Sequence, residues 1–153
     1  MPGIVVGIGG SGSGFAAARV AARVAEAMAL PLVLVFGFEA SPLGPRGGPL
    51  EERIAAVGAD AVAQIRDELH AARPALVIEV EMVAQRPADA LVAVAEERDA
   101  DAIAVGHGGA GPLRAALLGS VTYEIVHRAP RPVLVVPDDD EDVVNQTSPR
   151  GAI

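Results

Sequence analysis

The sequence predicts an α/β fold: a single domain with an open sheet of five parallel strands and helices on both faces. Five short runs rich in Val, Ile and Leu are typical of strands buried on both sides. The stretches between most of them carry helical spacing. Aromatic residues make up only 3% of the chain, so the core has to be aliphatic and packed between regular elements. Such alternation of strand and helix is typical of a doubly wound sheet with right-handed crossovers.

The predicted strands are short and aliphatic. They lie at residues 4–8, 32–36, 77–83, 102–105 and 133–136. The first ends in glycines, and the last is flanked by Pro132 and Pro137. Proline is confined to strand ends and edges, so the run from Val133 to Val136 is expected at an edge of the sheet. An edge strand can pair with a second copy, and we therefore expect a homodimer through this strand.

The predicted helices occupy the stretches between the strands. Apolar residues recur at helical spacing over residues 17–28 and again over residues 54–69. Pro87 suits the first position of a third helix, and a fourth follows from Val121 until Pro130 ends it. Residues 41–49, dense in Pro and Gly, are expected to form a surface loop. Residues 1–137 then form the domain, and residues 138–153, which open with five acidic residues, form a disordered tail.

Composition excludes several function classes. The net charge of −8 argues against nucleic acid or an anionic membrane surface as the main partner. The chain contains no Lys, which excludes a Walker-type phosphate lysine and a Schiff base. It also contains no Cys, a composition that suits a reducing interior. With no long apolar segment and no basic leader, the chain is expected to be soluble, cytoplasmic and free of membrane contact.

One glycine pattern indicates a phosphate-binding site. Gly106 and Gly109 follow the predicted fourth strand directly, and Gly119 and Ser120 precede the fourth helix. Glycines at a strand end allow close backbone approach, and the beginning of a helix offers free N–H donors. Together the two segments predict a nucleotide-binding site.

These four residues have the spacing Gly, two residues, Gly, nine residues, Gly, Ser. On this signature, and on its flanking segments 99–101, 117–121 and 132–136, the chain closely resembles the universal stress protein family over about residues 3–137. The resemblance implies the strand order 3-2-1-4-5, a homodimer and, as in one subgroup, bound ATP. It further implies a sensor or regulator of the stress response that binds ATP or a related adenine nucleotide.

The resemblance also implies a set of contacts to the nucleotide. Gly106 and Gly109 would line the phosphates, with backbone amides and hydroxyls supplied by residues 119–122. Gly37 would face the adenine, and residues 7–9 would border the nucleoside. His107, inside the glycine loop, could donate to a phosphate or stack on a base. The predicted nucleotide-binding residues are Gly7, Ile8, Gly9, Gly37, Val105, Gly106, His107, Gly109, Gly119, Ser120, Val121 and Thr122.

Three positions depart from the family pattern. Gly9 stands where the ATP binders usually carry an Asp near ribose and metal, so any Mg²⁺ would rely on the nucleotide for its oxygen ligands. Ala110 replaces a frequent Arg or Lys, which removes a charge-assisted contact that Arg114 can partly replace. Gln85 stands where a Gly is common. ATP remains the expected ligand.

Two alternatives remain open. The first is a dimeric scaffold of the same fold that binds no nucleotide. The second is a dinucleotide-binding oxidoreductase module, because Gly7, Gly9 and Gly12 fit G-x-G-x-x-G and Glu39 stands where it could hold a ribose hydroxyl. No catalytic residues are predicted, since Ser120 has no His-and-acid arrangement to activate it; at most, slow ATP hydrolysis is expected.

Overall fold

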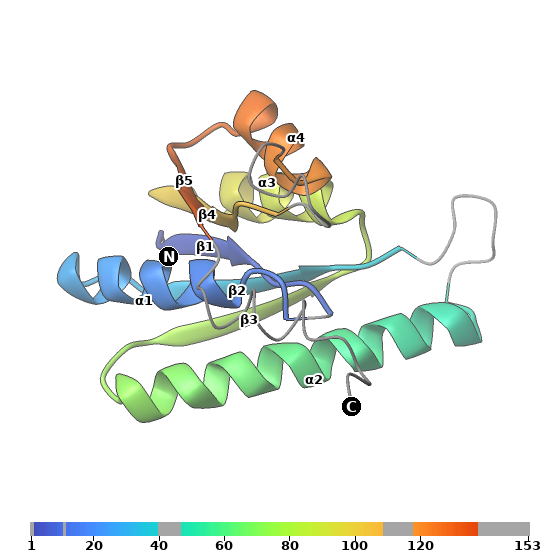
Figure 1. Cartoon of the computed structure of the whole chain (residues 1–153), viewed down its shortest axis with the longest axis horizontal. Coiled ribbons are helices and arrows are strands. Elements are labelled where there is room, and N and C mark those ends of the chain that lie inside the picture. The colour runs from blue at the N-terminus through green and yellow to red at the C-terminus, as the bar shows by residue number, and fades with distance from the viewer. Residues whose placement is uncertain (1, 11, 40–46, 109–117, 138–153) are drawn as a thin grey trace, which may run out of the picture.

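Five parallel strands and four helices alternate along the chain in the computed structural model, which describes residues 2–10, 12–39, 47–108 and 118–137 (Figure 1). The elements are β1 (Ile4–Gly7), α1 (Phe15–Ala27), β2 (Leu32–Gly37), α2 (Pro49–Ala72), β3 (Ile78–Val83), α3 (Pro87–Glu97), β4 (Ala102–Gly106), α4 (Ser120–Arg128) and β5 (Val133–Val136). The predicted fold class is therefore confirmed.

The strands form one sheet in the order β3-β2-β1-β4-β5, and every pairing is parallel. This is the order that the family resemblance implied. β5 lies at one edge of the sheet, as its flanking prolines predict, and β3 lies at the other. Because the chain leaves β1 toward one side of the sheet and β4 toward the other, the winding direction changes between these neighbours. A doubly wound sheet binds ligands at this point, beyond the carboxyl ends of its strands.

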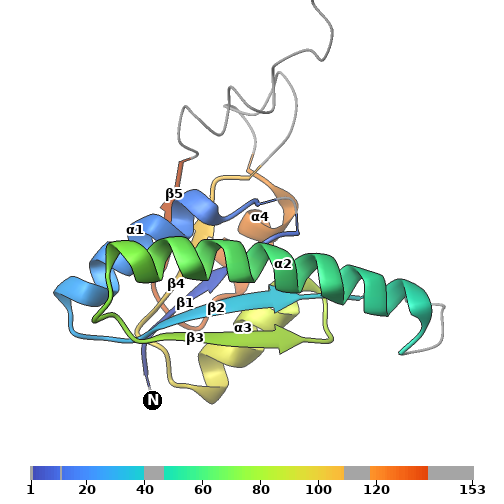
Figure 2. The same cartoon turned by 90° about the horizontal axis from the view of Figure 1, so that it is seen from below.

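Two aliphatic cores cover the two faces of the sheet. α1 and α2 pack on one face and α3 and α4 on the other, as Figures 1 and 2 show from two directions. The buried face of α1 is a stripe of alanines, among them Ala17, Ala18 and Ala21, and small side chains let the helix lie close to the strands. Side chains alternate along β1, with Ile4 and Val6 in the first core and Val5 in the second.

Several element boundaries differ from the sequence prediction: β1 ends at Gly7 instead of Ile8, and β2 and β4 each extend one residue further, to Gly37 and Gly106. α2 begins at Pro49, inside the stretch predicted as a loop. Proline is favourable at the first helical position, and Glu51 and Glu52 in the first turn stabilise the positive end of the helix dipole. β3 begins at Ile78 instead of Val77, although the carbonyl of Val77 still accepts a hydrogen bond from the Leu32 amide at 2.9 Å.

Candidate functional site

Residues 106–108, after β4, and residues 119–122, at the beginning of α4, meet at the carboxyl ends of the strands. The Gly119 amide donates to the carbonyl of His107 at 3.1 Å. The Thr122 hydroxyl donates to the carbonyl of Gly106 at 2.5 Å. Thr122 is only 4% exposed and is the one buried polar residue in the part of the chain that the structure describes. Its hydrogen bond therefore joins the two segments from inside the fold.

The contact between these segments requires glycine. Gly108 has a φ of +70°, in the left-handed region, and a Cβ placed on it would lie 2.9 Å from the Cα of Gly119. Main chain therefore contacts main chain here, with no room for a side chain between them. The two segments form one continuous backbone surface, which we call the glycine cradle (residues 106–108 and 119–122).

The beginning of α4 contributes free donors to the glycine cradle. Gly119 is the N-cap residue, and the first hydrogen bond of the helix runs from the Tyr123 amide to the Gly119 carbonyl at 2.9 Å. The amides of Ser120, Val121 and Thr122 precede it and have no acceptor among the described residues. The Ser120 side chain is exposed and caps nothing in the described chain. These donors, with the helix dipole, favour an anion.

The loop between β1 and α1 borders the glycine cradle. Gly14 has a φ of +87°, and a Cβ on it would lie 2.1 Å from the carbonyl oxygen of Gly7. A Cβ on Gly106 would lie 3.7 Å from the Gly14 amide nitrogen, so the two glycine segments lie side by side. The Gly9 amide donates to the carbonyl of Ser13 at 2.8 Å and tightens the turn. The described residues contain no group of three His, Asp or Glu placed to hold a metal ion.

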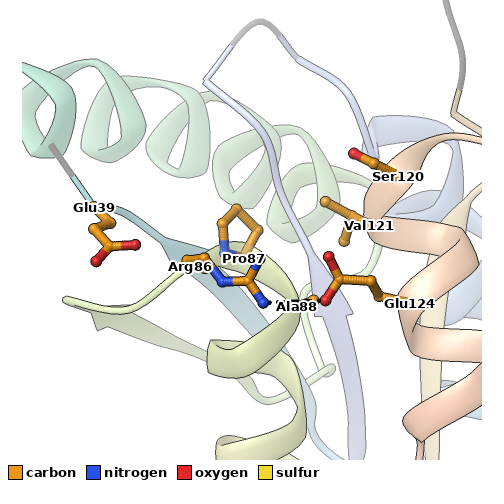
Figure 3. A pocket seen from close by; sticks show the side chains of 7 residues that line it. All are labelled: Glu39, Arg86, Pro87, Ala88, Ser120, Val121 and Glu124. Atoms are coloured by element: carbon orange, nitrogen blue, oxygen red, sulfur yellow. Dashed lines mark hydrogen bonds and ion pairs between the residues drawn. The ribbon is translucent and has the colours of Figure 1, made fainter. Parts of the chain in front are cut away.

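A hollow of about 300 Å³ adjoins the glycine cradle on the side of α3. Figure 3 shows its side chains, which come from the end of β2, the beginning of α3 and the first turns of α4. Pro87, Ala88 and Val121 supply apolar surface, and Ser120 belongs both to the hollow and to the glycine cradle. The other lining residues are charged: Glu39, Arg86 and Glu124.

Four charged side chains join α3 to α4, and we call them the charge ring (Arg86, Asp89, Glu124 and Arg128). Two of them, Arg86 and Glu124, line the hollow. Arg86 donates from Nε to Asp89 Oδ2 at 3.0 Å and from Nη2 to Glu124 Oε2 at 3.2 Å. Arg128 Nη1 lies 2.8 Å from Asp89 Oδ1 and 3.1 Å from Glu124 Oε2. Each arginine therefore contacts both carboxylates, and the ring is closed.

The contacts in the charge ring shift the pKa values of Arg86, Asp89 and Arg128 toward the charged forms. Hydrogen bonds from Arg86 and then Arg128 lower the pKa of Asp89. The hydrogen bond to Asp89 is the largest cause that raises the pKa of Arg86 and of Arg128. Because these side chains remain partly exposed, water screens their attraction and each pair adds little stability. The ring fixes the position of its side chains more than it stabilises the fold.

The structure places the predicted site residues in different surroundings. Residues 106, 107 and 119–122 form the glycine cradle, and Val121 also lines the hollow. Gly7 and Gly37 are the last residues of β1 and β2. A Cβ on Gly37 would lie 2.8 Å from the Cα of Pro87, so a ligand could contact only the main-chain atoms of Gly37. Ile8 and Val105 have buried side chains. Gly9 lies in the bordering turn. Gly109 lies outside the described residues.

Sequence reasoning missed the charge ring, although it named Glu39 for the dinucleotide alternative. Arg86 and Asp89 are three residues apart, and Glu124 and Arg128 are four apart, spacings at which side chains meet on one helix. That pattern could have predicted the two pairs within their helices. It could not show that the pairs meet across α3 and α4, because that contact depends on both helices covering the same face of the sheet.

The chain thus has the doubly wound α/β class of fold, with its glycine cradle at the change of winding direction, where ligand sites lie in such sheets. The chain belongs to the universal stress protein family, whose family model matches residues 2–137. No curated protein matches the chain. None of the helices in the described ranges is long and apolar enough to cross a membrane.

Solved structures of universal stress proteins are similar to this chain. The chain is 30% identical to a universal stress protein in complex with cAMP, with 90% of this chain and 98% of that chain covered and a TM-score of 0.68. It is 26% identical to the universal stress protein of Archaeoglobus fulgidus in complex with dAMP, covering 89% and 98%, with a TM-score of 0.64. UspA from Lactobacillus plantarum shares the fold, at 23% identity, with coverage of 88% and 97% and a TM-score of 0.73.

Proposed function

We propose that the protein binds ATP or a related adenine nucleotide, with the phosphates at the glycine cradle, and acts as a stress-response regulator. The observation that carries this proposal is the meeting of residues 106–108 with residues 119–122, which gathers free backbone amides at the beginning of a helix. Two relatives that cover nearly the whole domain were solved with adenine nucleotides.

The described residues fit a phosphate group. The amides of Ser120 and Val121 have no acceptor among the described residues, and the Ser120 side chain is exposed beside them. Hydrogen bonds to a charged oxygen are stronger than neutral ones. Gly9 offers no carboxylate to a metal ion. We therefore propose that any Mg²⁺ is held by the oxygens of the nucleotide. Because the protein then adds no ligand to the metal, the affinity for AMP is expected to be the same in Mg²⁺ and in EDTA.

We further propose a homodimer formed through β5. β5 is an edge strand with the sequence VLVV, and Val135 is 39% exposed. Tyr123 and Val126 of α4, the helix that leads into β5, are also exposed. A cytoplasmic location is proposed as well, on the absence of cysteine from the sequence.

Calorimetric titration with AMP, ADP and ATP tests the nucleotide proposal. The wild-type protein is expected to bind them, and Ser120→Ala is expected to weaken AMP binding about tenfold, since it removes one hydrogen bond to a charged group. Ser120→Thr keeps the hydroxyl and is the matched control, expected to bind as wild type does. Because the Ser120 side chain caps nothing in the described chain, neither change should alter the melting temperature.

The outcomes separate the alternatives. No heat with any of the three nucleotides, and no nucleotide released from gently purified protein in mass spectrometry, would contradict the proposal and leave a ligand-free scaffold of this fold. Equal AMP affinity in wild type and Ser120→Ala would leave the function in place and remove Ser120 from the site. A response to NADH alone would favour the dinucleotide alternative.

A further inference from the structure

Arg86 is the one arginine that lines the hollow beside the glycine cradle, among the residues the structure describes. Its side chain is 53% exposed. Two of its nitrogens are already engaged: Nε donates to Asp89 and Nη2 to Glu124. Figure 3 shows Arg86 in the hollow, with Glu39 on one side and Glu124 on the other. The guanidinium is therefore held at one edge, while its flat faces take no part in these hydrogen bonds.

The charges of the hollow do not suit a phosphate group. Its described lining contains two carboxylates, Glu39 and Glu124, and one guanidinium, so the positive charge of Arg86 is already compensated. An anion placed here would be repelled by the remaining carboxylate. An uncharged ligand part with N–H or O–H donors suits this lining, because the carboxylates can accept hydrogen bonds from it.

The apolar lining indicates a flat ring. Pro87 and Ala88 at the beginning of α3 and Val121 at the beginning of α4 offer surface without hydrogen-bonding side chains. The volume, about 300 Å³, is at the lower end of the range for small-molecule sites. It matches one part of a nucleotide better than the whole. A planar base against these side chains would lie within reach of the guanidinium, and bases stack on guanidinium planes.

We propose that Arg86 stacks on the base of the bound nucleotide, and that Asp89 and Glu124 are positioning residues that hold its guanidinium in place. This inference rests on the proposed function and adds the side chain that contacts the base of the nucleotide. The glycine cradle takes the phosphates, the hollow takes the base, and Ser120 lies where the two regions join. The charge ring thus fixes an otherwise flexible side chain before the ligand arrives, which lowers the entropic cost of binding.

Titration of adenosine, AMP and ATP against Arg86 variants tests the proposal. Arg86→Gln is expected to weaken all three ligands by the same factor, about tenfold, because stacking acts on the base that they share. Arg86→Lys keeps the charge and removes the planar group, so it is expected to lose nearly as much. Glu124→Gln replaces the charge-assisted hydrogen bond to Nη2 with a weaker neutral one and is expected to give a smaller loss of adenosine affinity. Arg66→Gln, an exposed arginine of α2 outside the hollow lining, is the control and should change nothing.

Three outcomes of these titrations would each overturn the inference. A loss that grows from adenosine to ATP and is restored by Arg86→Lys would assign Arg86 to the phosphates. Unchanged affinities in Arg86→Gln would remove it from the site. Failure of wild-type protein to bind any adenine ligand would instead contradict the proposed function, and the inference with it. Circular dichroism melting of each variant checks that the fold is kept, as expected for a half-exposed side chain.

Discussion

At the scale of single residues, this site depends on positions where a side chain is missing. Gly108 allows residues 106–108 to touch the backbone before α4, and Gly14 allows the first loop to pass over the end of β1. Both have positive φ, but the left-handed conformation is only part of the requirement. The space beside each is already filled by main chain, which cannot move aside as a flexible side chain can.

Alanine substitutions at Gly14 and Gly47 separate the cost of a left-handed φ from the cost of steric contact with the main chain. Gly14→Ala combines a left-handed φ with a Cβ 2.1 Å from a backbone oxygen. Gly47 has a φ of +75°, and a Cβ on it would have no atom of the described residues within 4 Å. We expect Gly47→Ala to cost about 1–2 kcal/mol from backbone strain alone. Gly14→Ala should cost well above that, about 3 kcal/mol or more. Urea unfolding of the two variants measures the difference, and equal costs would mean that backbone strain alone decides.

At the scale of elements, helices are held to the sheet by close approach and by charge. α2 passes over β2 so closely that a Cβ on Gly58 would lie 2.2 Å from the ring of Phe36. The Phe36 ring is only 6% exposed and stacks with Phe38, at a centroid distance of 6.1 Å. It is enclosed and has little freedom to move. On the other face, the charge ring joins α3 and α4 at their exposed surface.

The packing of α2 predicts that one glycine-to-alanine substitution lowers the stability of the protein, although helix propensity alone would raise it. Alanine is favoured over glycine in a helix interior by about 1 kcal/mol, yet Gly58→Ala is expected to destabilise the protein by about 1–3 kcal/mol through overpacking against Phe36. In the double variant with Phe36→Leu, part of that cost should be recovered, which a double-mutant cycle in urea detects. A more stable Gly58→Ala protein would show that the helix can move away from the sheet.

The charge ring predicts a dependence of stability on pH. The folded-state pKa of Asp89 is lowered, chiefly by Arg86, so its contribution is present above the unfolded value of about 3.9 and is lost as the pH falls below it. Asp89→Asn should therefore lower the urea midpoint slightly at pH 7, and the difference from wild type should shrink as acid protonates Asp89 and vanish once it is fully protonated. Asp67→Asn is the control, since Asp67 is 77% exposed and its ion pair is 3.8 Å long. A difference that persists in acid would show that charge is not the cause.

At the scale of the whole molecule, the two edges of the sheet differ in charge. β3 carries Glu79 and Glu81, which pair with Arg98 at the end of α3. β5 carries no charge and exposes Val135. Charged residues protect an edge strand from pairing with another chain, so we expect the proposed dimer to form at β5 and not at β3.

Matched substitutions on the two edges test the dimer. Val135 on β5 is 39% exposed and Val80 on β3 is 36% exposed. We expect Val135→Arg to convert the dimer to a monomer in sedimentation experiments, because a charge would be buried at the interface, whereas Val80→Arg should leave it dimeric. The reverse result would place the interface at β3, and a wild-type monomer would contradict the dimer altogether.

Much of the fold could be predicted because its signals are local. Aliphatic runs gave the strands, helical periodicity gave the helices, and Pro132 and Pro137 predicted the edge position of β5. The strand order came from the resemblance to a family, and the structure confirms it. The beginning of α2 was misplaced because a stretch dense in Pro and Gly favours a loop, while Pro49 in fact occupies the first position of a helix.

The sequence by itself determined the strands and helices, and it predicted a phosphate site from the glycine spacing and from the small hydroxyl residue before a helix, because these signals lie in the order of the chain. Only the tertiary structure decided that Gly108 lies against Gly119, that Thr122 joins the two segments, and that Arg86 of α3 meets Glu124 of α4. The physical reason is distance along the chain. Local backbone preferences act over a few residues, whereas these contacts join residues that come together only when four helices cover two faces of one sheet.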